Sequence, residues 1–117
     1  MIDDQVEPEI FVRLRVPGFH HWPGAPGSRA YLAASHRHLF HLVVSMPVSH
    51  SDREVEFHDL IDELRALFPA GFDHGARSCE LMATDIARTL SARHDRPVTV
   101  EVSEDGEAGA RVTTYED

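Results

Sequence analysis

Cysteine is almost missing from this sequence, since Cys79 is the only one in 117 residues. A single thiol excludes an intramolecular disulfide and a zinc site built from several cysteines. Any metal site must therefore depend on histidine and carboxylate side chains. Histidine is abundant instead, with nine residues in the chain.

Long apolar runs and clusters of basic residues are also missing. No stretch reaches the roughly 20 apolar residues that cross a bilayer, and the N-terminus "MIDDQVEPE" is acidic where a signal peptide is basic. The formal net charge of −9 at pH 7 argues against binding to phosphate backbones. We therefore expect a cytoplasmic protein with no membrane segment and no nucleic-acid partner.

The length of the chain predicts one domain over residues 1–117. "EIFVRLRV" alternates apolar and polar residues as a half-buried strand does, and a second strand is expected over residues 31–48, with an interruption near Ala34. "FHDLIDELRALF" has the spacing of an amphipathic helix. A second helix is expected after Ser78, ending near His94, with inward apolar residues at Leu81, Met82, Ile86 and Leu90.

Two further alternating segments, "PVTVEVSE" and "GARVTTYE", are joined by a turn containing "DGEAG" and complete the order ββααββ. This order predicts an α+β fold in which an antiparallel sheet carries both helices on one face. Such a sheet leaves a strand edge at each side, and edges must be covered, charged or paired. We therefore expect a homo-oligomer.

The segment "HRHLFH" is the most informative motif. Residues two apart on a strand share a face, so His36 and His38 present their imidazoles together while Arg37 points away. Two imidazoles on a rigid strand suit Zn²⁺, and the pair His20 and His21 could supply a third ligand. The alternative is that these histidines are solvated or satisfied in the core.

Other residues are candidates for chemistry or for ligand binding. Asp73 precedes His74 in the loop between the helices, where a carboxylate could orient an imidazole for proton transfer. Glu104, at a strand end, could accept hydrogen bonds from amino and ring N–H groups of a ligand, or be a solvated turn residue. Trp22 could stack on an aromatic ligand or anchor its loop. A helix N-terminus would lower the pKa of Cys79, whereas the alternative is structural burial.

Taken in order, these segments resemble the 6-pyruvoyl-tetrahydropterin synthase and 6-carboxytetrahydropterin synthase family. The resemblance rests on "GFHHW", "SHRHLFHLVV", "REVEFHDL", "FDHGA", "SCELMATDIA" and "VEVSEDGEAGARVTTYE". It implies the tunnelling fold (T-fold) and an oligomer that binds a pterin-like or purine-like heterocycle between subunits. It also implies zinc on His36 and His38 together with His21, or with His20 in its place.

The resemblance further implies that Asp73 and His74 are catalytic, that Glu80 matches the glutamate at the family's helix start, and that Glu104 anchors the heterocycle. The family's catalytic cysteine lies four residues before the first histidine of its H-x-H motif, and Leu32 occupies that place, while Arg37 replaces the glycine inside the motif. We therefore expect a zinc-dependent lyase-type protein with altered chemistry. The alternative is a non-catalytic protein that sequesters or senses a nucleotide-derived ligand.

Overall fold

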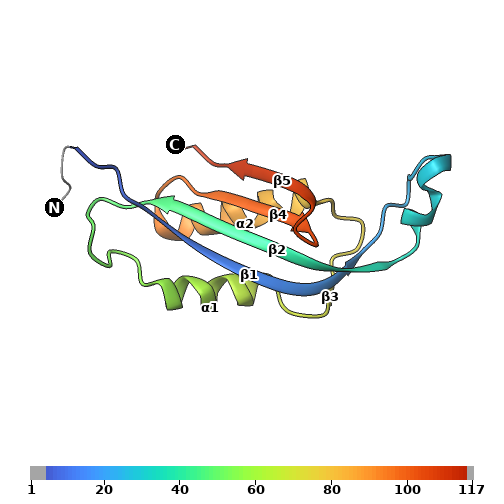
Figure 1. The fold of residues 1–117 in the computed structure, drawn as a ribbon, viewed down its shortest axis with the longest axis horizontal. Helices are drawn as coiled ribbons and strands as arrows, with labels where there is room; N and C mark the ends of the chain where they lie inside the picture. The colour runs from blue at the N-terminus through green and yellow to red at the C-terminus, as the bar shows by residue number, and fades with distance from the viewer. Residues whose placement is uncertain (1–4, 116–117) are drawn as a thin grey trace.

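The computed structural model describes residues 5–115, which form an α+β fold around one mixed sheet (Figure 1). The strands are β1 (Glu9–His20), β2 (His36–Pro47), β3 (Phe72–Asp73), β4 (Thr99–Glu104) and β5 (Ala108–Thr113). The helices are α1 (Phe57–Leu67), α2 (Cys79–His94) and the short 3-10 helix η1 (Gly27–Ala33). The strand order in the sheet is β3-β1-β2-β4-β5.

The two helices cover the same face of the sheet, as the sequence predicts. Alternate residues of β1, β2 and β4 enter one continuous core with the buried faces of α1 and α2. The strand residues of this core are Val12, Leu14, Val16, Phe40, Leu42, Val44, Met46, Val100 and Val102. The intervening residues, among them Arg13 and Arg15, are on the opposite face of the sheet.

Both helices begin at a side-chain cap. The Ser78 hydroxyl accepts a hydrogen bond from the Leu81 N–H at 3.2 Å, and the Glu56 carboxylate accepts one from the His58 N–H at 3.0 Å. The inward stripe of α2 starts at Cys79 and continues through Met82, Ala83, Ile86, Ala87 and Leu90. Leu81 does not belong to this stripe and is 48% exposed, so the prediction that it points inward is wrong.

The sheet is not purely antiparallel, which corrects the prediction. β3 pairs with β1 in parallel through Gly18↔Phe72 and Phe19↔Asp73. The segment after α1 returns along the free edge of β1, where the Gly71 N–H donates to the Pro17 carbonyl at 2.7 Å. This pairing satisfies backbone groups that the edge of β1 would otherwise expose.

The second strand also begins later than the sequence predicts. Residues 27–33 form η1, so β2 starts at His36 and Tyr31 lies outside the strand. The β1–β2 pair is in register along its whole length, from Glu9↔Pro47 to His20↔His36. Figure 1 shows this long hairpin carrying η1 beyond the end of the sheet.

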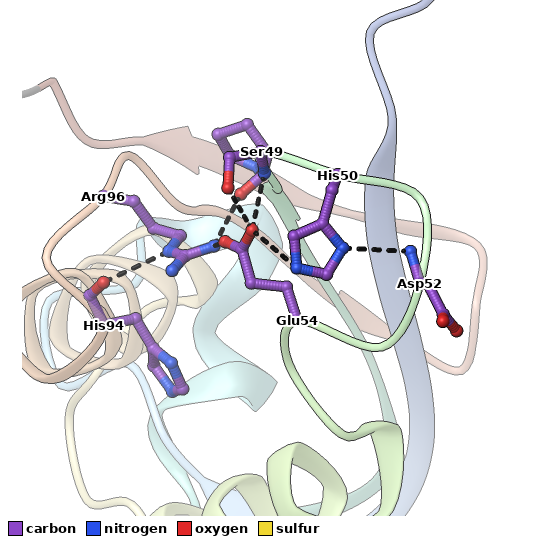
Figure 2. Close-up of polar contacts among 7 residues, drawn as sticks. Ser49, His50, Asp52, Glu54, His94 and Arg96 are labelled. Carbon is purple, nitrogen blue, oxygen red and sulfur yellow. Dashed lines mark hydrogen bonds and ion pairs between the residues drawn. The ribbon is translucent and has the colours of Figure 1, made fainter. Parts of the chain in front are cut away.

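At the other end of the hairpin, a polar network ties the β2–α1 connection to the end of α2 (Figure 2). The Glu54 carboxylate accepts hydrogen bonds from the N–H and hydroxyl of Ser49 and from the Arg96 guanidinium at 2.5 Å. Arg96 also donates to the carbonyls of Pro47 and His94, each at 3.1 Å. The bonds from Ser49 and Arg96 lower the pKa of Glu54 to about 2.

Candidate metal centre and adjoining pocket

Three histidines and one glutamate come together on the helix-bearing face of the sheet. His20 ends β1, His36 and His38 begin β2, and Glu104 ends β4. The strand register places His20 opposite His36 and Phe40 opposite Glu104. These side chains have the same parity as the core residues, so the cluster continues the core face past the last apolar side chains.

The four side chains are close enough to bind one ion. One ligand atom from each of His20, His36, His38 and Glu104 lies within 4.8 Å of all the others. The ring centroids of the histidines are 4.6, 4.9 and 5.3 Å apart, with the rings nearly perpendicular. The Glu104 carboxylate lies 2.9 Å from His20 Nε2 and 3.6 Å from His38 Nε2.

The second nitrogen of each ring already has an oxygen partner. His20 Nδ1 is 3.1 Å from the Arg77 carbonyl, and His36 Nδ1 is 3.0 Å from the Ala34 carbonyl. His38 Nδ1 is 2.8 Å from the Asp105 carboxylate. Because carbonyl and carboxylate oxygens only accept, each Nδ1 must carry the proton and donate, which leaves the Nε2 lone pair for a metal.

The Nε2 atoms support this assignment. Those of His20 and His38 are buried and make no hydrogen bond within residues 5–115, although Glu104 is close to both. A buried polar atom without a hydrogen bond is costly unless another partner, such as a cation, takes its place. Three neutral imidazoles and a carboxylate are a donor set that zinc binds in proteins.

Asp105 holds the His38 ring through a carboxylate, which is a stronger hydrogen-bond acceptor than a backbone carbonyl. Its carboxylate accepts the Leu39 N–H at 2.9 Å as well as the His38 Nδ1–H. These two bonds, the backbone one above all, lower the pKa of Asp105 below its ordinary value. The carboxylate therefore stays ionised and holds the His38 ring in one orientation.

Of the two adjacent histidines, the structure places His20 in the cluster and leaves His21 outside it. His20 is 7% exposed and lies on the core face, whereas His21 has the opposite parity beyond the end of β1. Its backbone N–H donates to the Gly75 carbonyl at 2.8 Å. Of the two alternatives that the sequence leaves open, His21 and His20, the geometry of the cluster therefore favours His20.

A cavity of about 540 Å³ adjoins the cluster. It contains all three residues expected to bind a ligand, namely Trp22, Glu80 and Glu104. The remaining lining residues are His20, His21, Leu32, His36, Ala76, Arg77, Ser78, Cys79, Ala108 and Gly109. The structure thus brings an indole, two carboxylates and two of the three cluster histidines, His20 and His36, to one pocket.

Cys79 lines this pocket but does not supply a thiolate. Its side chain is 6% exposed, and burial raises the pKa of the thiol to about 12, with further contributions from Glu104 and Glu80. The expected effect of the helix N-terminus is therefore outweighed, and structural burial is the correct interpretation.

Asp73 and His74 lie beside the cluster rather than in it. The Asp73 carboxylate accepts the Gly75 N–H at 2.8 Å, and the structure records no hydrogen bond between it and His74. The His74 ring stacks on Phe68 with centroids 4.2 Å apart, and its Nε2 is buried without a hydrogen bond within residues 5–115. Burial lowers the pKa of His74, so the imidazole is neutral near pH 7.

Sequence reasoning missed two supporting residues. Asp105 belongs to the "DG" of a predicted turn, where Asp is common for conformational reasons, so its sequence context did not indicate a functional role. Gly18 faces His38 across the hairpin, and a Cβ there would lie 3.2 Å from the Phe40 ring and 3.3 Å from the His74 ring. The absence of a side chain at this position allows both rings to pack against β1.

No family model matches the sequence, and no curated protein matches it significantly. Among residues 5–115, no helix is both long and apolar enough to cross a membrane.

Proposed function

We propose that this chain is a zinc-dependent T-fold protein of the pterin synthase type, which takes a pterin-like or purine-like heterocycle into the pocket beside its metal centre. The observation that carries the proposal is the convergence of three histidines whose Nδ1 atoms all face acceptor oxygens. Solvated histidines need no such partners, whereas a metal-ligating histidine donates one ring N–H to an acceptor so that the other nitrogen presents its lone pair.

The fold supports the T-fold and oligomeric parts of the proposal. Four antiparallel strands in the order β1-β2-β4-β5 carry α1 and α2 on one face. β5 is an open edge of the sheet, and η1 has no buried residue and carries Tyr31 at 68% exposure. Neighbouring subunits would cover these surfaces and enclose the pocket.

The pocket has the groups that a flat heterocycle with amino and ring N–H groups needs. Trp22 offers an aromatic face, and Glu80 and Glu104 offer carboxylate acceptors. Zinc bound by His20, His36 and His38 would supply a Lewis acid for a substrate carbonyl or hydroxyl. The neutral His74 would accept a proton, and Asp73 would stabilise the imidazolium that forms.

A second candidate is a ligand-binding protein without turnover. Leu32 lines the pocket where the resemblance places a catalytic cysteine, and leucine cannot transfer a proton. The single thiol of the chain, that of Cys79, is held protonated by burial. Under this candidate the metal and the pocket serve binding alone, so His74→Ala would leave ligand affinity intact and no product would form with wild type.

Trp22 provides a direct binding assay because it is the only tryptophan. We expect pterin and guanine, titrated separately into the zinc-loaded protein, to quench its fluorescence saturably for at least one of the two. Glu80→Ala should weaken that binding about tenfold or more, the value of a hydrogen bond to a charged group, whereas Glu107→Ala in the exposed β4–β5 turn should not. Absence of saturable quenching by either compound would contradict the proposed ligand class.

A further inference from the structure

Glu104 occupies an unusual place among the acidic residues, because its carboxylate faces metal-binding nitrogens instead of a cation or a backbone N–H. Within residues 5–115 its carboxylate forms ion-pair contacts only with His20 Nε2, at 2.9 Å, and His38 Nε2, at 3.6 Å. Neither nitrogen makes a hydrogen bond to it. An ordinary histidine–glutamate ion pair would direct a ring N–H at the carboxylate.

The spacing matches four ligands around one small ion. Zinc binds imidazole nitrogen and carboxylate oxygen at about 2.0–2.2 Å, so two ligand atoms of a tetrahedral site lie about 3.3 Å apart. One Glu104 oxygen lies 2.9 Å from His20 Nε2 and the other lies 3.6 Å from His38 Nε2, so each oxygen is within a few tenths of an ångström of this spacing from one histidine. All four ligand atoms lie within 4.8 Å of one another, so small side-chain movements would complete the tetrahedron.

We infer that Glu104 is the fourth protein ligand of the metal while the pocket is empty, so that the resting centre is a closed site of His20, His36, His38 and Glu104. This inference rests on the proposed function, because it requires the three-histidine zinc site. Such a closed site is regulated by ligand exchange, because an oxygen of the heterocycle must displace Glu104 before the metal can act on the heterocycle. The released carboxylate then faces the pocket that Glu104 lines, where it can accept the amino and ring N–H groups of the heterocycle.

The test uses metal alone, with no heterocycle. Wild type, Glu104→Ala, Glu104→Gln and the control Glu107→Ala are stripped with a chelator and checked for unchanged far-UV circular dichroism. Zinc affinity is then measured by competition with a chromophoric chelator, and Co²⁺ is added separately to read coordination geometry from its visible absorption. Glu107 lies in the same turn region and is exposed, so its loss changes the charge equally without touching the cluster.

We expect the zinc affinity of both Glu104 variants to be lower than that of wild type by a factor on the order of 100 or more. Loss of a residue that only hydrogen-bonds to a metal ligand lowers metal affinity by roughly 10–100-fold, so a larger loss indicates direct coordination. Their Co²⁺ absorption should fall as water enters the coordination sphere, and added acetate should restore it in Glu104→Ala. Glu107→Ala should match wild type. Wild-type affinity and an unchanged Co²⁺ spectrum in both Glu104 variants would overturn the inference and leave the three-histidine site standing. Failure of wild type itself to bind zinc would overturn both.

Discussion

Phe40 links the core to the candidate metal centre, and its replacement by leucine gives a sharp prediction. The side chain is fully buried, and its ring lies edge-on to the rings of four neighbours. The centroid distances are 5.3 Å to His20, 5.7 Å to His38, 5.6 Å to Phe68 and 5.8 Å to His74. Leucine would keep the site apolar but would remove every one of these ring contacts.

The expected cost follows from these contacts. Aromatic pairs contribute about 0.5–1.5 kcal/mol each beyond the area that they bury, and shared partners make the four contributions less than additive. The smaller leucine side chain also leaves unfilled volume in a close-packed site. We therefore expect Phe40→Leu to lower the free energy of unfolding by about 2–3 kcal/mol, or the melting temperature by roughly 10 °C for a domain of this size.

The matched control is the same substitution at Phe11, which is 53% exposed on the opposite face of the sheet. Its main ring contact is the Arg13 guanidinium, 4.7 Å from the centroid, so Phe11→Leu should cost less than about 1 kcal/mol. Urea denaturation in the presence of a chelator measures both variants without metal. Equal free energies for the two variants would refute the assignment of Phe40 as the support beneath the histidines.

Three further predictions test individual contacts. Asp105→Asn keeps a hydrogen-bond acceptor but loses the charge that holds His38, so zinc affinity should fall roughly 10–100-fold in a chelator competition; an unchanged affinity would contradict the role given to Asp105. Glu54→Gln removes a carboxylate whose pKa in the folded protein, about 2, lies below the ordinary 4.5. The carboxylate therefore stabilises the fold above about pH 4.5, and this effect is lost as pH falls toward 2. The denaturation midpoints of wild type and variant should converge over that range, and a constant difference between them would contradict this pH dependence. Ser78→Ala removes the N-cap of α2 and should lower the free energy of unfolding by about 1 kcal/mol in urea denaturation. An unchanged free energy of unfolding would show that the cap hydrogen bond does not stabilise the protein.

Local periodicity accounts for much of what the sequence could predict. Alternation along β1, β2, β4 and β5 gave the core face, and the parity of His36 and His38 placed their rings together. The spacing of apolar residues in α1 and the N-cap of α2 at Ser78 are also local sequence signals. Each of these features depends on neighbours within a few residues, so a single sequence carries the information.

The features that the sequence could not predict depend on the register between strands that are distant in the sequence. The choice between His20 and His21 is a shift of one residue, which reverses the face of a strand, and the pairing of His20 with His36 fixes it. That pairing spans a connection containing η1, whose length and shape the sequence did not reveal. The two residues of β3 are too few for any pattern, and the position of Glu104 beside the histidines requires the β2–β4 register.

The most direct test of the central claim is the zinc content of the purified protein, measured by elemental mass spectrometry after zinc supplementation and removal of loosely bound metal. Wild type should contain about one zinc per chain, and a His36→Ala, His38→Ala double variant should contain almost none. His58→Ala, which removes a histidine whose side chain is 87% exposed, should match wild type. No zinc in wild type, or equal zinc in the double variant, would contradict a metal centre at these histidines.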